Sequence, residues 1–182
     1  MENLYKELRS FFANDMDLND LFDSEAIIWI DWREDDEDVV NYFNDMIDEP
    51  IDIKTVSNGK AYGDDIVLKN GDKELQIPYG DEQDRDVTIK YFNDFVKPDY
   101  EVRWFAESLG NDTLGFTVLS GAEWANLEDE FGIDTVRYYF EPIDLESDIF
   151  NLDMDEVSTL LALRENSEGV NTEFVGTHGE ML

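Results

Sequence analysis

Residues 102–106 and 114–119 share a pattern in which side chains on alternate positions would face the same side of an extended chain. Val102, Trp104 and Ala106 occupy one side of the first run, and Leu114, Phe116 and Val118 occupy one side of the second. A period of two predicts β-strands. The polar, glycine-containing sequence SLGND lies between them and is typical of a hairpin loop. We therefore expect an antiparallel hairpin in which Trp104 faces the core, since it alternates with Arg103.

A helix start follows the hairpin. Ser120 and Glu123 have the spacing of a capping box, in which each side chain bonds the backbone N–H of the other residue. Trp124, Leu127 and Phe131 then recur at helical spacing, and Gly132 is typical of a helix end.

The region before the hairpin alternates between helical and extended patterns. Helical spacing predicts an amphipathic helix over residues 1–12, a short turn over 18–22 and a helix over 39–47 that ends before Pro50. The run AIIWIDW at residues 26–32 is apolar on both sides apart from Asp31, which favours a central strand covered on both faces. Residues 51–57, 64–69 and 73–79 predict three strands joined at Asn58-Gly59, through a longer irregular connection, and at Asn70-Gly71.

The remaining segments complete a mixed fold. Residues 87–96 predict a helix that stops at Pro98, residues 136–140 predict a helical segment before Pro142, and residues 154–161 predict a last helix after a linker at 144–148. Tight turns between successive strands predict an α+β fold with a mixed, mainly antiparallel sheet of about five to six strands and helices packed on it. We expect one domain over residues 1–164 and a flexible C-terminal tail over residues 165–182.

Charge is the unusual property of this composition. The 182 residues include 46 Asp and Glu but 13 Lys and Arg, which gives a formal net charge of -33. Solubility of a small domain requires a net charge of only about 2–8 in magnitude, and the excess opposes folding by self-repulsion. Three explanations compete: adaptation to high salt, a charge that serves solubility but exceeds what solubility requires, and recognition of a strongly basic partner. The abundance of Asn, Ile and Phe with little Ala argues against salt adaptation.

The residue types present exclude several classes of chemistry. The chain has no cysteine, which removes disulfides, thiolate nucleophiles and cysteine-containing zinc sites. Its one histidine, His178, rules out sites built from several histidines. Nucleic acid is not expected as a direct partner, because phosphate binding needs clustered Lys and Arg. The sequence has no pattern of a signal peptide or of a membrane span, so we expect a cytoplasmic protein.

Two acidic runs each precede a predicted helix, where a carboxylate favours the positive end of the helix dipole. If both runs lie at the same end of the sheet, they form a fixed negative patch beside an exposed aromatic anchor. The predicted partner-binding residues are Trp32, Glu34, Asp35, Asp36, Glu37, Asp38, Asp81, Glu82, Asp84 and Asp86.

Metal sites are not supported by the spacing of the acids. Asp15, Asp17 and Asn19 start like an EF-hand loop, but Asp20 replaces its glycine and Ala26 replaces its last ligand. The run at Asn151, Asp153 and Asp155 fails in the same way. Asp65, Glu74 and Gln76 resemble the carboxylates of metal-dependent nucleases, but Gln76 replaces the usual lysine. No phosphate-binding loop occurs, and we predict no metal and no cofactor.

The sequence DYEVRWFAESLGNDTLGFTVLSGAEWANLEDEFG, with IIWIDWRE upstream, resembles a pattern in small acidic bacterial proteins of unknown function. In size and charge it is similar to immunity proteins that neutralise bacterial toxins and to phage anti-defence proteins that mimic DNA. The resemblance implies an inhibitor and assigns no functional residue.

These observations predict a non-catalytic inhibitor that neutralises a basic protein, either a nuclease toxin or a nucleic-acid-binding defence protein. Two alternatives remain. One is an interaction or scaffold domain whose charge serves solubility and which binds through an apolar patch. The other is a metal-dependent hydrolase.

Overall fold

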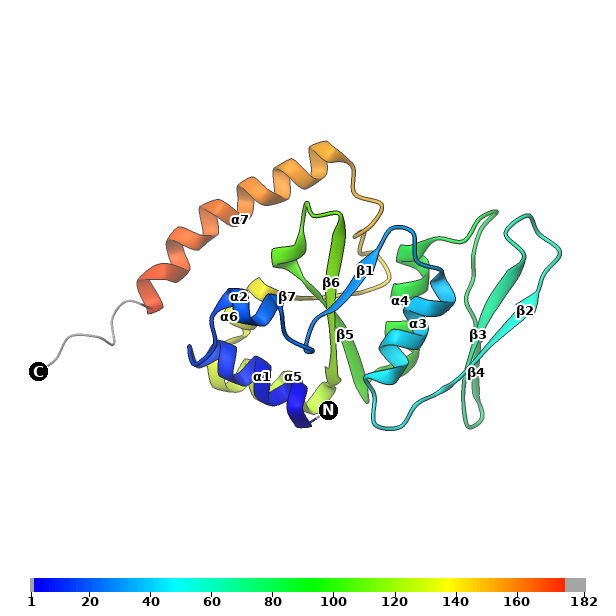
Figure 1. The fold of residues 1–182 in the computed structure, drawn as a ribbon, viewed down its shortest axis with the longest axis horizontal. Coiled ribbons are helices and arrows are strands. Elements are labelled where there is room, and N and C mark those ends of the chain that lie inside the picture. The colour runs from blue at the N-terminus through cyan, green and yellow to red at the C-terminus, as the bar shows by residue number, and fades with distance from the viewer. Residues whose placement is uncertain (1, 176–182) are drawn as a thin grey trace, which may run out of the picture.

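A four-stranded antiparallel sheet forms the centre of the fold (Figure 1). The computed structural model describes residues 2–175, with side chains for residues 3–166. The strands lie in the order β1-β6-β5-β7. Their bounds are Ile28–Asp31 for β1, Tyr100–Phe105 for β5, Thr113–Ser120 for β6 and Phe140–Pro142 for β7. The α+β fold class predicted from the sequence is confirmed.

The predicted hairpin is β5 and β6, which pair with Val102 opposite Val118 and Trp104 opposite Phe116. Ala106 was predicted as the last residue of the first strand. It instead begins a short 3-10 helix, Ala106–Ser108, at the start of the loop. The Ser108 hydroxyl explains this turn. It donates to the Phe105 carbonyl at 2.6 Å and accepts from the Gly115 N–H at 2.9 Å, so it takes over bonds that a longer ladder would supply.

The capping box after the hairpin is present and starts helix α5 (Gly121–Phe131). Gly132 ends this helix with a φ of 92°, a conformation that favours glycine, and α6 (Ile133–Tyr139) begins directly after it. The sequence did not predict strand β7, which follows α6 and pairs with β5 through Phe140 opposite Phe105.

Helices cover both faces of the four-stranded sheet (Figure 1). On one face lie α1 (Glu2–Phe12), α2 (Leu18–Phe22), α5 and α6, and on the other lie α3 (Asp36–Asp45) and α4 (Arg85–Val96). The first cluster of buried side chains includes Leu8, Phe105 and Trp124. The second includes Phe43, Phe92 and Trp104, whose indole is 5% exposed, as its alternation predicted.

The three strands between α3 and α4 form a separate sheet in the order β2-β3-β4, so the predicted single sheet is wrong. These strands are β2 (Asp52–Ser57), β3 (Asp64–Asn70) and β4 (Lys73–Gln76). A turn at Gly71-Asp72, one residue past the predicted Asn70-Gly71, joins the last two, because Asn70 still pairs with Lys73. Ile66 and Leu68 of β3 belong to the same buried cluster as α3 and α4. These two helices therefore lie between two sheets, which gives four layers.

Two predictions about residue positions are corrected by this layering. Residues 26–32 were predicted as a central strand, but β1 lies at the edge of its sheet beside β6. Arg103 alternates with Trp104 and was expected to face away from the core. It is 3% exposed, because α5 covers that face of the sheet as well.

Helix α7 runs over Met154–Val175 and crosses the body above β5 and β6 (Figure 1). It continues past residue 164, where the sequence predicted the domain to end. The rest of the predicted tail, including His178, lies outside the described residues. Across residues 2–175, no helix combines the length and apolar content that crossing a bilayer requires.

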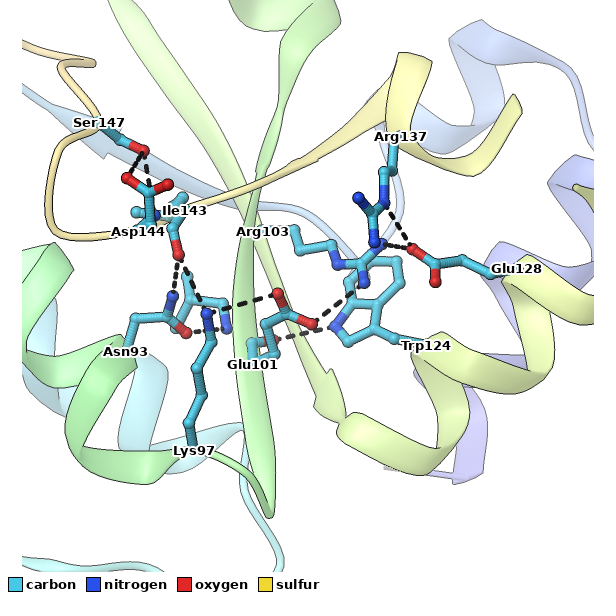
Figure 2. A network of polar contacts seen from close by, with 11 residues as sticks. Asn93, Lys97, Glu101, Arg103, Trp124, Glu128, Arg137, Ile143, Asp144 and Ser147 are labelled. Carbon is cyan, nitrogen blue, oxygen red and sulfur yellow. Dashed lines mark hydrogen bonds and ion pairs between the residues drawn. The ribbon is translucent and has the colours of Figure 1, made fainter. Parts of the chain in front are cut away.

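A buried polar network joins the helices to β5 (Figure 2). Arg103 donates to Glu128 at 2.8 Å and to Glu101 at 3.1 Å, while its guanidinium carbon lies 4.3 Å from the centre of the Trp124 ring. Arg137 donates to the same Glu128 carboxylate at 3.0 Å. Burial opposes ionisation of Glu128, but the hydrogen bonds from these two arginines outweigh it and hold its pKa below the ordinary value.

We expect Arg103→Ala to destabilise the fold by about 3–5 kcal/mol, because it leaves two partly buried carboxylates without their buried partner. Arg137→Ala is the matched control. This side chain is half exposed and shares Glu128, so its loss should cost at most about 1 kcal/mol. Urea unfolding followed by circular dichroism measures both values. Equal losses for the two variants would contradict a dominant role for Arg103.

Candidate interaction surface

Arg85 joins the two acidic runs. Its Nε donates to Asp36 Oδ1 at 2.6 Å, its Nη1 donates to the Asp31 carbonyl at 3.0 Å, and its Nη2 donates to the Glu34 carbonyl. These acceptors belong to the end of β1, the turn after it and the start of α3, whereas Arg85 is the first residue of α4. The N-termini of α3 and α4 therefore lie side by side, although they are far apart in the sequence.

The Asp36 carboxylate faces inward at this joint and is 6% exposed. Its second oxygen accepts from the Thr88 hydroxyl at 2.6 Å. Because Thr88 has one hydroxyl proton, the Tyr79 hydroxyl, 2.7 Å away, donates to Thr88. Burial is the main reason why the pKa of Tyr79 is raised, which keeps its proton in place for this bond. Asp36 is therefore held by structural bonds.

Asp86 is also directed into the protein and is 1% exposed. Its two oxygens accept backbone N–H groups from Ile149 at 2.9 Å, Phe150 at 2.8 Å and Asn151 at 3.0 Å. A carboxylate that accepts three backbone N–H groups fixes the path of the chain. Asp86 thus anchors the segment before α7 to the start of α4, and it presents no carboxylate at the surface.

Asp84 caps α4 by accepting the backbone N–H groups of Asp86 at 2.9 Å and Val87 at 3.2 Å. The Asn151 side chain donates to both Asp84 oxygens at 3.1 Å. Asp84 is half-buried, and its orientation is fixed by these bonds. The cap explains why the chain places an acid here, independent of any partner.

The predicted interface residues therefore separate into two groups. Asp36 and Asp86 point inward and are excluded from a direct contact by their burial. Those that reach the surface are Trp32, Asp35, Glu37, Asp38, Asp81 and Glu82, which are exposed, and Glu34 and Asp84, which are half-buried. The structure brings all of them to the joined ends of α3 and α4 and the loop before α4.

Glu34 has an unfavourable environment within this surface. Its Oε2 is buried and has no hydrogen-bond partner. Burial is the largest cause of its raised pKa; Arg85 opposes the rise, while the charges of Asp31 and Asp38 add to it. The pKa of Tyr42 on α3 is raised as well, chiefly by the negative charge of Glu34. The ionised form of Glu34 is therefore destabilising in the folded protein.

A groove of about 520 Å³ opens beside these acids. Trp32 and Phe150 form its aromatic part, with ring centroids 5.3 Å apart in an edge-to-face arrangement. Asp81 and Glu82 line the groove from the loop before α4. Trp32 is 58% exposed, an unusual state for a residue that normally buries most of its surface.

The sequence did not identify the residues that assemble this surface. In the sequence, Arg85 stands out only because it interrupts an acidic run. No sequence pattern indicates that Phe150 and Asn151 lie beside it in the fold. A lone arginine within a run of acids at a helix start could indicate a buried ion pair, because a buried guanidinium needs several acceptors at once.

Asp65, which the sequence pattern placed among the nuclease-like carboxylates, is engaged in local structure. Asp65 accepts from Asn58 and from the Tyr62 hydroxyl, each at 2.7 Å, and from Gln76 at 2.6 Å. The Tyr62 bond is the largest of the causes that lower the pKa of Asp65. Within the part of the chain that the structure describes, no group of three or more His, Cys, Asp or Glu residues is arranged to hold a metal ion.

We expect Asp86→Asn to destabilise the protein by about 2–3 kcal/mol, since the amide cannot accept all three N–H groups and loses the charge that strengthens them. Amide hydrogen exchange at residues 149–151 should become faster. Asp94→Asn on the same helix is the control, because Asp94 is exposed and its neutralisation should change stability by less than about 0.5 kcal/mol. Unchanged exchange at residues 149–151 would contradict the anchor.

We expect Glu34→Gln to stabilise the protein at pH 7, with a smaller effect than Asp86→Asn and the opposite sign. The folded pKa of Glu34 lies above its unfolded value near 4.5, so its ionisation costs stability above the folded pKa. That cost disappears as the pH falls below 4.5, where both states are protonated. Thermal unfolding of both proteins between pH 4 and pH 7 measures the difference. A gain that persists at pH 4 would contradict this origin.

Comparisons of the chain with protein-family models, with curated proteins and with solved structures each gave no match. The function proposed below is therefore inferred from the residues and geometry of the chain itself.

Proposed function

We propose that the protein is a non-catalytic inhibitor that acts in the cytoplasm and neutralises a basic protein partner. The partner is a nuclease toxin or a nucleic-acid-binding defence protein, and the carboxylates of the inhibitor occupy positions meant for phosphates. The interface consists of Trp32, Glu34, Asp35, Glu37, Asp38, Asp81, Glu82 and Asp84.

The observation that carries this proposal is the joint at Arg85. Two acidic runs lie on one surface because a single guanidinium holds the Asp36 carboxylate and the carbonyls of Asp31 and Glu34. The exposed acids thus lie at or just before the starts of two helices, and the buried Arg85 side chain fixes the relative position of these helices. A rigid array of negative charge is what a mimic of nucleic-acid phosphates requires, since an array that is already ordered loses little entropy on binding.

The distribution of positive charge supports the same function. At least ten of the 13 Lys and Arg residues make intramolecular ion pairs or hydrogen bonds, and together the 13 can neutralise only a minority of the 46 acids. A field of this sign accelerates encounter with a basic partner and disfavours polyanions. The attraction weakens as salt shortens the screening length, which is about 8 Å at physiological ionic strength.

A scaffold function is the second candidate, and helix α7 favours it. Met154, Leu161 and Leu163 on this helix are 77%, 39% and 60% exposed. A partner bound through these apolar side chains would bind almost independently of salt, whereas a partner of the acidic surface would be released by salt.

We expect the triple variant Asp35→Lys, Glu37→Lys, Asp38→Lys to lose at least about tenfold in affinity for the partner, because it reverses the field at the start of α3. The partner is first isolated by pull-down from a lysate of the host, with stepped salt elution and mass spectrometry. Affinity is then measured with the purified partner, and its nucleic-acid cleavage or binding is assayed with and without the inhibitor.

The matched control reverses three exposed acids elsewhere, Glu25→Lys, Asp129→Lys and Asp134→Lys, and changes the net charge equally. This control should lose much less affinity, because its charges lie away from the proposed interface. Near-ultraviolet circular dichroism confirms that both variants are folded. Equal losses would show that only net charge matters, and binding that survives high salt would favour the scaffold function.

A further inference from the structure

The Trp32 groove combines an exposed aromatic ring with a negative wall. The residues that line it include the acids Asp81, Glu82 and Asp84 and one cation, Arg85. The Arg85 guanidinium is already bonded to Asp36 and to two backbone carbonyls, so its charge is compensated from within the protein. The groove therefore presents net negative charge to a molecule that enters it.

The chain repeatedly holds its own arginines between an aromatic ring and a carboxylate. Arg103 lies 4.3 Å from the centre of the Trp124 ring and pairs with Glu128 at 2.8 Å, as Figure 2 shows. Arg164 lies 4.3 Å from the centre of the Tyr138 ring and pairs with Glu107.

A third arginine is arranged in the same way at the groove itself. Arg85 lies 5.4 Å from the centre of the Phe150 ring and pairs with Asp36 at 2.6 Å. In all three places the guanidinium carbon lies over an aromatic ring while a carboxylate accepts from one of the guanidinium N–H groups.

Trp32 has the ring and the neighbouring carboxylates of such a site. Among the cation–ring contacts of the described residues, none involves Trp32, and its ring lies at 86° to that of Phe150. Arginine suits this arrangement better than lysine, because its guanidinium is planar and weakly hydrated and can stack and hydrogen-bond at the same time.

We propose that the groove receives an arginine side chain of the basic partner, which stacks on Trp32 and pairs with Asp81 or Glu82. This inference rests on the proposed function and specifies the chemistry of its partner. The long-range field draws in any basic protein, and the groove selects one that presents an arginine at the right place. A lysine ammonium can also lie over a ring, as Lys73 does over Phe95 at 4.5 Å, but it cannot stack as a plane and bond a carboxylate through a planar fork at the same time, so it gains less.

The test uses fluorescently labelled hexa-arginine and hexa-lysine peptides, whose affinities are measured by fluorescence anisotropy at low ionic strength. We expect the wild-type protein to prefer hexa-arginine by about threefold to tenfold. Trp32→Leu should remove most of this preference by weakening hexa-arginine more than hexa-lysine. Trp32→Phe should retain part of the preference, because it keeps an aromatic face.

Two further variants separate the groove from general effects. Asp81→Asn with Glu82→Gln should weaken both peptides, with the larger loss for hexa-arginine. Tyr42→Leu removes another exposed ring, 40% exposed and close to the acids of α3 but outside the groove, and should leave the preference unchanged.

The outcomes distinguish the inference from the proposed function. If both peptides bind but Trp32→Leu leaves their affinity ratio unchanged, the arginine site is overturned and the proposed function stands. A ratio that falls equally with Tyr42→Leu overturns the site as well. If neither peptide binds the wild-type protein at low salt, the proposed function fails together with the inference.

Discussion

The buried ion pair between Arg85 and Asp36 is the interaction on which the arrangement of this molecule depends. The two side chains are 12% and 6% exposed, and removing such a pair from water costs several kcal/mol per ion. The cost is offset by further hydrogen bonds: Thr88 donates to Asp36, and Arg85 donates to the backbone carbonyls of Asp31 and Glu34. A pair of this kind contributes little net stability, but it allows only one relative position of α3 and α4.

This constraint extends from the helix pair to the rest of the fold. Helices α3 and α4 lie between the two sheets, so their relative position also sets the position of the three-stranded sheet. Through Asp86, the start of α4 fixes the segment at residues 149–151 and thereby Phe150, against which Trp32 packs. The same few bonds therefore determine the layers and the shape of the acidic surface.

The sequence predicted those features that local patterns determine. The capping box at Ser120, the turn after β3 and the helical stripes depend on neighbours within a few residues. The capping box was found where expected, the turn lies one residue later, and the helices lie where the stripes predicted, although Phe140 belongs to β7 instead of the helix before it. The features missed depend on distant contacts. Burial of Arg103 requires α5 to cover the face on which it lies, and the division into two sheets requires α3 and α4 to pack between them. For the same reason, a run of acids could not reveal which carboxylates point inward.

The division of the acidic runs into buried and exposed members explains how the chain tolerates its charge. Asp36, Asp84 and Asp86 are compensated by an arginine, a helix N-terminus and backbone N–H groups, so they strengthen the fold that brings the remaining acids together. The exposed acids gain at most the field of a helix N-terminus and repel one another, and the free energy of folding must offset that repulsion. A basic partner would relieve it on binding. Relief of this repulsion would favour such a complex in addition to any apolar contact that forms.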